Sequence, residues 1–214
     1  VSSPGIGQPF AALSGLAAEP YLEPVLYAVP DAALLSSIYQ IWTVGPFARV
    51  TTLARVVKAD PDTGAPVQQA YDLEGIAVDA SIAAPRRAPR GFWLASEGNG
   101  KALDDGGIPN LLVQVDRRGV VLEEVPLPIE VEDLESHAGA TGYIGSNGFE
   151  GVAVSQSGRY LLAAIQREYK GDKKVDGVLH TRIGRYDLVT GAWEFFLYPL
   201  EPTAAPGDWI GLSE

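Results

Sequence analysis

The stretch Leu73-Glu74-Gly75-Ile76-Ala77-Val78 decides how this chain folds, because it returns as Phe149-Glu150-Gly151-Val152-Ala153-Val154. An earlier copy, Leu13-Ser14-Gly15-Leu16-Ala17, has a serine in place of the glutamate, and a broken copy occupies residues 209–214. The glycines of the four copies, at positions 15, 75, 151 and 211, lie 60, 76 and 60 residues apart. Repetition at such intervals indicates a chain built from repeated structural units.

The segments between the copies alternate short apolar runs with turns that end in glycine. Runs rich in β-branched and aromatic residues are typical of strands, and the glycine supplies the positive φ of a tight hairpin. Each period holds about four such runs, so we expect four short antiparallel strands per repeat. Residues 31–40 are expected to form one or two turns of helix. The predicted strands occupy residues 91–96, 110–116, 120–125, 159–165, 181–187 and 192–198.

Repeated four-stranded units predict an all-β fold, a β-propeller whose blades are antiparallel sheets; a stacked β-solenoid is the alternative. We interpret residues 1–214 as one partial propeller domain with repeats starting near residues 13, 73, 149 and 209. The chain then supplies about three blades and the start of another. Because a closed propeller needs at least ~4 blades, we expect the remainder beyond residue 214 or from a second fragment or partner chain.

Composition excludes several classes of function. The 214 residues carry a formal net charge of −11, which argues against a nucleic-acid partner because phosphates need a basic surface. The absence of cysteine excludes thiol catalysis and cysteine-ligated zinc. No apolar run of about 18 residues is present, so no membrane span is expected. The chain starts without Met, which suits a processed, exported protein found in the periplasm or secreted.

The glutamates beside the repeated glycines are the first candidates for chemistry. If the motif forms the inner strand of each blade, Glu74 and Glu150 converge on the central channel, where they need a cation or a proton to relieve their repulsion. The adjacent glycine lets neighbouring backbones approach near the axis. Glu97 ends the following strand, and Glu214 closes the broken copy. Glutamates that cap turns within each blade are the alternative interpretation.

These stretches resemble the phytase-like family described as having esterase-like activity. The resemblance includes Asp72-Leu73-Glu74-Gly75-Ile76-Ala77-Val78, Phe92-Trp93-Leu94-Ala95-Ser96-Glu97-Gly98 and Asn147-Gly148-Phe149-Glu150-Gly151, and it continues to Gly211-Leu212-Ser213-Glu214. It implies a secreted or periplasmic β-propeller whose recurring acidic residues bind metal and act on small phosphoesters. Ser14 departs from the repeated glutamate, so the ring of acids is not symmetric.

The mechanism that the resemblance implies is calcium-assisted hydrolysis of a phosphoester. Glu74, Glu150 and Glu214 would bind Ca²⁺, Glu97 and Arg167 would act in catalysis, and Asn147 would contact the substrate. Arg167 follows a strand end in the same way as Glu97 does, although an exposed loop arginine is the ordinary alternative. Two other functions stay open, a non-catalytic scaffold or binding subunit with a structural ion and a lactonase-like propeller hydrolase.

Overall fold

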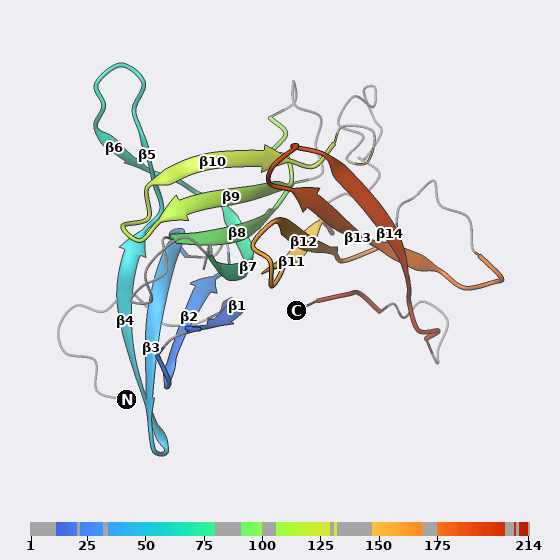
Figure 1. Ribbon diagram of the computed structural model, residues 1–214, viewed down its shortest axis with the longest axis horizontal. Helices are drawn as coiled ribbons and strands as arrows, with labels where there is room; N and C mark the ends of the chain where they lie inside the picture. The colour runs from blue at the N-terminus through green and yellow to red at the C-terminus, as the bar shows by residue number, and fades with distance from the viewer. Residues whose placement is uncertain are drawn as a thin grey trace.

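The computed structural model contains three four-stranded antiparallel sheets that fan around a common centre (Figure 1). It describes residues 12–20, 22–31, 34–79, 91–99, 106–128, 131, 147–168, 175–203, 208 and 210–213. Within each sheet the strands follow one another in sequence order, so every blade is a simple meander. Sheets of consecutive antiparallel strands are propeller blades and not the coils of a stacked β-solenoid. The predicted fold class is therefore confirmed.

Each repeat supplies one blade, and its first strand lies nearest the centre. Blade 1 contains β1 (Leu13–Ala18), β2 (Val25–Pro30), β3 (Ser37–Val44) and β4 (Phe47–Arg55). Blade 2 contains β7 (Asp72–Asp79), β8 (Gly91–Glu97), β9 (Leu111–Asp116) and β10 (Val121–Pro126). Blade 3 contains β11 (Phe149–Val154), β12 (Tyr160–Ile165), β13 (His180–Asp187) and β14 (Trp193–Pro199).

The hairpin turns lie where their glycines predict them. Gly119, Gly158 and Gly191 have φ values of +81°, +70° and +70°, in the region that favours glycine. A separate two-stranded hairpin, β5 (Val57–Ala59) with β6 (Pro66–Gln68), leads from blade 1 to blade 2. Its turn is stabilised by the Asp60 carboxylate, which accepts hydrogen bonds from the backbone N–H groups of residues 62 and 63.

Blade 1 shows one error of the sequence-based prediction. Residues 31–40 are expected from the sequence to contain helical turns, but residues 37–40 form the start of β3, which begins at Ser37; residues 32 and 33 lie outside the described ranges. The Ser36 hydroxyl donates to the Tyr71 carbonyl oxygen and accepts from the Tyr71 N–H, so this entry to β3 is tied to the start of blade 2. Long-range hydrogen bonds and strand pairing determine the conformation of this segment. Neither can be read from the local periodicity of the sequence. In the part of the chain that the structure describes, no helix has the length and apolarity needed to cross a membrane.

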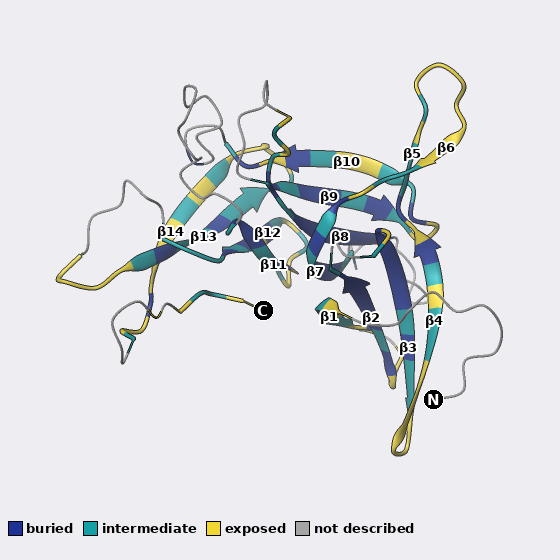
Figure 2. Ribbon diagram, turned by 180° about the vertical axis from the view of Figure 1, so that it is seen from behind, coloured by how far each residue is buried: buried dark blue, intermediate teal, exposed yellow. Residues whose placement is uncertain are grey.

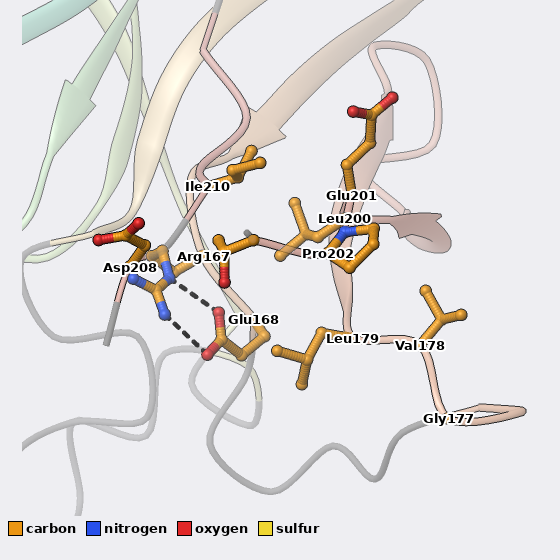
Figure 3. Close-up of a pocket in the computed structure, with 11 residues that line it drawn as sticks. Arg167, Glu168, Gly177, Val178, Leu179, Leu200, Glu201, Pro202, Asp208 and Ile210 are labelled. Carbon is orange, nitrogen blue, oxygen red and sulfur yellow. Dashed lines mark hydrogen bonds and ion pairs between the residues drawn. The ribbon is translucent and has the colours of Figure 1, made fainter. Parts of the chain in front are cut away.

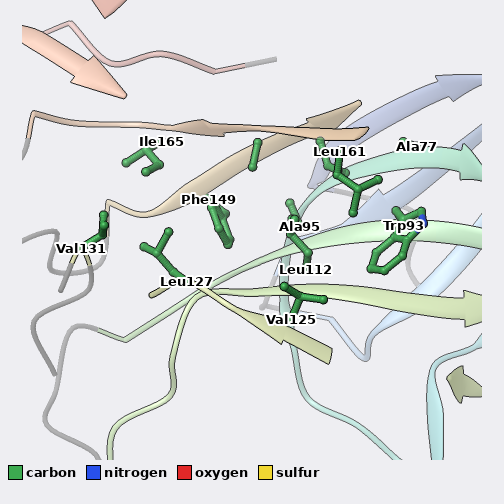
Figure 4. Packing of buried hydrophobic residues seen from close by; sticks show 12 residues of the cluster. Ala77, Trp93, Ala95, Leu112, Val125, Leu127, Val131, Phe149, Leu161 and Ile165 are labelled. Atoms are coloured by element: carbon green, nitrogen blue, oxygen red, sulfur yellow. The ribbon is translucent and has the colours of Figure 1, made fainter. Parts of the chain in front are cut away.

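Both faces of blade 2 are largely buried (Figure 2). One face packs against blade 1 and the other against blade 3. Alternate residues of β8 point to opposite sides: Phe92 and Leu94 join the core shared with blade 1, and Trp93 and Ala95 join the core shared with blade 3. All four side chains are at most 1% exposed. Figure 4 shows the second of these cores, in which Phe149 from blade 3 packs among residues of blade 2. Burial of large apolar side chains on both sides of one sheet is the main force that stacks the blades.

The inner strands approach one another most closely at the repeated glycine. A Cβ placed on Gly75 would lie 2.8 Å from the Gly151 Cα atom and 2.9 Å from the Val152 nitrogen. No side chain fits at that distance, so β7 and β11 meet backbone to backbone, as the glutamate-glycine motif predicts.

Candidate metal centre

In every blade, a β-bulge in the innermost strand contains the repeated polar residue. The pairing of the first strand with the second shifts register between Leu13 and Gly15, between Leu73 and Gly75, and between Phe149 and Gly151. The extra residue in each bulge is the one that the repeat singled out, namely Ser14, Glu74 and Glu150. Bulges re-aim side chains and are common beside functional sites.

Two further positions recur at the same end of each blade. The residue that precedes or begins the inner strand pairs with the residue that follows or ends the second strand. These pairs are Ala12 with Asp31, Asp72 with Glu97, and Gly148 with Gln166. At these positions and at the bulges, the described part of blade 2 has three carboxylates, whereas blades 1 and 3 have one each, Asp31 and Glu150.

The carboxylates of Asp31, Asp72 and Glu74 form the tightest group. One oxygen from each lies within 4.8 Å of the others. Oxygen ligands surround Ca²⁺ at 2.3–2.6 Å, so two ligands of one ion lie at most about 5 Å apart. The spacing and the all-oxygen donor set therefore fit a hard divalent cation that bridges blades 1 and 2.

Burial and mutual repulsion raise the pKa of Glu74 to about 7. Burial is the largest cause, and the negative charges of Glu150, Asp72 and Asp31 add to it, whereas a hydrogen bond with Ser14 opposes it. Ser14, which departs from the repeat, thus contacts the neighbouring blade's glutamate. The asymmetric ring is built from a hydroxyl and two carboxylates at the bulges.

Glu97 has the most strongly raised pKa of this group, about 8. Burial is again the largest cause, with the charges of Glu150, Asp72 and Glu74 adding to it. The Gly148 N–H donates to Glu97 Oε1 at 2.9 Å and partly offsets these effects. A carboxyl group with such a pKa holds its proton at neutral pH, which is the property of a general acid.

The third blade completes the centre with a hydrogen-bonded pair. The Gln166 side-chain amide donates to Glu150 Oε1. Asn110, 1% exposed, holds the strand ends together nearby, because its Oδ1 accepts from the N–H groups of Gly98 and Phe149 at 3.1 and 2.8 Å. Gly148 leaves the space that the Asn110 side chain occupies, since a Cβ there would lie 1.7 Å from Oδ1.

The structure distributes the predicted site residues unequally. Glu74, Glu97 and Glu150 come together, since the charge of Glu150 acts on both of the other two carboxyl groups. Arg167 lies one residue beyond Gln166, but its guanidinium forms a two-pronged ion pair with Glu168 at 2.8 Å and lines a separate pocket (Figure 3). Asn147 is half-buried and directly precedes Gly148. Glu214 lies outside the described residues.

Asp31, Asp72 and Gln166 are residues of the centre that sequence reasoning missed. Asp72 directly precedes the second copy of the motif, so extending the repeat by one residue would have included it. Asp31 and Gln166 occupy the position of Glu97 in their own blades, which becomes visible only when the ends of the second strands are aligned. The expected helix over residues 31–40 concealed that alignment in blade 1.

Comparison with known proteins supports one family assignment. The family model described as phytase-like, esterase-like activity of phytase, matches residues 8–214. Searches of curated proteins and of solved structures found no match. The family match covers all three blades and every residue of the acidic centre within the described ranges, so the chain belongs to the phytase-like family.

Proposed function

We propose that the protein is a metal-dependent phosphoester hydrolase that uses calcium and acts on a small phosphoester. The observation that carries the proposal is the group of three carboxylates, Asp31, Asp72 and Glu74, with oxygens within 4.8 Å of one another at the end of the blades. Membership of the phytase-like family supports the class of reaction. Asp72 and Glu74 are half-buried, and Glu74 is the extra residue at the β-bulge of the inner strand β7.

In this proposal Asp31, Asp72 and Glu74 hold the ion, and Glu150 and Glu214 provide further oxygen ligands. When bound, a divalent cation neutralises phosphate charge and polarises the phosphorus centre. Without it, the negative charges of Asp31, Asp72 and Glu150 act on Glu74 and Glu97, whose pKa values are raised. A cation that binds here relieves that repulsion, which is why an acidic centre of this kind favours binding.

Glu97 is the residue that handles the proton. A water oxygen forms a bond to phosphorus, the bond from phosphorus to the leaving alcohol oxygen breaks, and Glu97 donates its proton to that oxygen. One hydrogen of the water stays on the product phosphate, and the other leaves as a proton that restores protonated Glu97 through solvent. The Gly148 N–H orients the carboxyl group through Oε1, so the remaining oxygen carries the proton. Asn147 and Arg167 are proposed to contact the substrate, Arg167 after exchanging part of its pairing with Glu168 for phosphate oxygens.

The test measures release of phosphate from phenyl phosphate in calcium and after chelation, for the natural sequence and for Asp72→Asn. We expect calcium-dependent turnover that Asp72→Asn reduces by about a hundredfold or more. Glu123→Gln, a change at an exposed position of β10, is the matched control and leaves turnover unchanged. Calcium binding without turnover would favour the scaffold function, and turnover of a lactone alone would favour the lactonase-like function.

We also propose that a further four-stranded blade, from another stretch of polypeptide or a partner chain, packs on the outer face of blade 3. Strand register makes this face equivalent to the face with which blade 2 binds blade 3. In blade 2, Ala95 pairs with Leu112 and Leu112 with Val125, all at most 5% exposed. The equivalent row in blade 3 is Ala164, Ile183 and Phe196.

The row in blade 3 is apolar, like the interface in blade 2, but its side chains are more exposed. Phe196 is 47% exposed, and Leu162, the counterpart of the buried Trp93, is 38% exposed. The Arg185 Cζ atom lies over the rings of Tyr160 and Phe196, at 4.8 and 5.4 Å from their centroids. A face that repeats an established interface residue by residue supports the same kind of occupant.

Cysteine labelling tests the further blade. Leu162→Cys would be a lone cysteine and is expected to react quickly with a maleimide in the isolated chain. In material purified natively from cells whose natural gene carries the same Leu162→Cys change, we expect much slower labelling. Val189→Cys, at a turn position that is 77% exposed, is the control and should react equally in both. Equal reactivity of Leu162→Cys in both preparations would remove this proposal.

Export to the periplasm or the extracellular space is part of the proposal, and family resemblance is its support. Fractionation of cells that express the natural gene, with a cytoplasmic enzyme as the marker of leakage, measures it. Recovery of the protein with the cytoplasmic marker would refute export.

A further inference from the structure

A pocket of about 280 Å³ lies at one end of blade 3 (Figure 3). One wall is the segment after β12, a second is the hairpin before β13, and a third is the segment after β14 together with residues 208 and 210. The walls are tied to one another, because the Leu200 N–H donates to the Leu179 carbonyl oxygen at 2.8 Å and the Thr181 hydroxyl to the Arg167 carbonyl oxygen at 2.9 Å. The pocket is therefore built by strand ends that the sheet holds in place.

The pocket and the acidic centre share one end of the propeller. Both are formed where the second strand of a blade ends, and Gln166 and Arg167 are consecutive residues at that place in blade 3. The Gln166 side-chain amide donates to Glu150 of the centre, and the Gln166 backbone carbonyl oxygen accepts from the Leu212 N–H at 2.9 Å. Leu212 is two residues from Ile210, which lines the pocket. A substrate held at the centre can thus extend into the pocket across Gln166.

The lining of the pocket is apolar with an excess of negative charge. Its apolar residues are Val178, Leu179, Leu200, Pro202 and Ile210. Its charged residues are one arginine, Arg167, and three acids, Glu168, Glu201 and Asp208. Because three acids face one arginine, the formal charge of the lining is negative. Such a lining favours an uncharged apolar group and repels a group that carries additional phosphates.

We propose that this pocket binds the leaving alcohol of the substrate, and that the alcohol is uncharged and apolar, such as an aryl or branched alkyl group. The inference rests on the proposed hydrolysis of phosphoesters at the acidic centre. It names the substrate class more narrowly, as monophosphate esters of apolar alcohols and not polyphosphorylated polyols. Leu179 is the selectivity residue that can be changed most safely, because it is 37% exposed and lies outside the blade cores.

The experiment compares kcat/KM for phenyl phosphate, glycerol 2-phosphate and inositol hexakisphosphate in calcium buffer. We expect phenyl phosphate to be preferred at least about tenfold over either of the others, which is the discrimination that one small apolar group can provide. Leu179→Glu is expected to abolish most of that preference. Val189→Glu, which adds the same charge at an exposed turn of blade 3, is the matched control and keeps it.

Binding of phenylphosphonate and methylphosphonate, measured by calorimetry, separates this inference from the proposed function. If no phosphoester is hydrolysed but phenylphosphonate binds about tenfold more tightly than methylphosphonate in a manner that Leu179→Glu removes, the hydrolase proposal fails and the pocket assignment survives. If phosphoesters are hydrolysed with no effect of Leu179→Glu on selectivity, or if inositol hexakisphosphate is the best substrate, the pocket assignment is overturned. Failure of both hydrolysis and phenylphosphonate binding overturns the two together.

Discussion

Replacing Glu97 by glutamine should stabilise the calcium-free protein, and the gain should grow with pH. The folded state raises the pKa of this carboxyl group from 4.5 to about 8, chiefly by burial. Between these values the unfolded chain has released the proton while the folded chain retains it, so the stability of the natural protein falls as pH rises. Below pH 4.5 both the folded and the unfolded state hold the proton, so Glu97 causes no loss of stability there. Above pH 8 the loss is complete. Glutamine has no proton to lose and removes the effect.

The expected magnitude follows from the pKa change. At about 1.4 kcal/mol for each pH unit, the rise from 4.5 to about 8 corresponds to at most ~5 kcal/mol. Glu97 is only half-buried, so solvent screens its charge and the true value is smaller. We therefore expect Glu97→Gln to raise the free energy of unfolding by about 2 kcal/mol at pH 9 and by little at pH 4. That gain corresponds to a rise in Tm of roughly 4–8 °C at pH 9.

Thermal unfolding in a chelating buffer at pH 4, 7 and 9 measures the effect. Glu123→Gln, which removes a carboxylate from an exposed position of β10, controls for the change in net charge. Added calcium should shrink the difference between Glu97→Gln and the natural sequence at pH 9, because the ion compensates the clustered charges. A difference in Tm that is the same at pH 4 and pH 9 would show that Glu97 does not titrate among the other acids.

Three further substitutions test the fold and the centre. Gly75→Ala brings a Cβ to 2.8 Å from the Gly151 Cα atom, so we expect a loss of about 1–3 kcal/mol in urea unfolding, together with weaker calcium binding as the inner strands separate. Trp93→Ala empties the core between blades 2 and 3 and should cost about 3–5 kcal/mol in the same assay; a loss below 1 kcal/mol would contradict the face-to-face packing. Asp31→Asn should weaken calcium binding at least about tenfold by calorimetry, since a ligand charge at close range contributes more than ~1.4 kcal/mol. Asp62→Asn, in the exposed hairpin turn, is its control, and an equal effect of both would refute a role for Asp31.

The repeat allowed most of the architecture to be predicted from sequence. The copies around Gly75 and Gly151 identified the inner strands, and the turns at Gly119 and Gly158 located the hairpins, because both depend on residues with unusual local requirements. Blade 1 was harder. Its second and third strands contain no such marker beside residues 31–40, and pairing with distant segments decided their conformation.

The acidic centre could be predicted only where the repeat displayed it. Glu74, Glu97 and Glu150 stood at motif positions, whereas Asp31 joins them through the spatial equivalence of strand ends. The pairing of Arg167 with its neighbour Glu168 could not be inferred from strand position, since it depends on how the chain turns after β12. Local sequence patterns therefore predict the residues of the centre that belong to the repeated motif. The other residues are found only from the equivalent positions of the blades in three dimensions.

The bulge in each inner strand separates chemistry from architecture. An ordinary strand residue belongs to one of the two sheet faces, so exchanging a small hydroxyl for a carboxylate there would disturb a stack of neighbouring sheets. The supernumerary residue at positions 14, 74 and 150 belongs to neither face. Evolution and protein engineers can therefore alter charge, ligand number or ion preference at these three places while the scaffold stays the same. Ser14→Glu is the simplest such exchange, and it would place a glutamate at the bulge of all three blades.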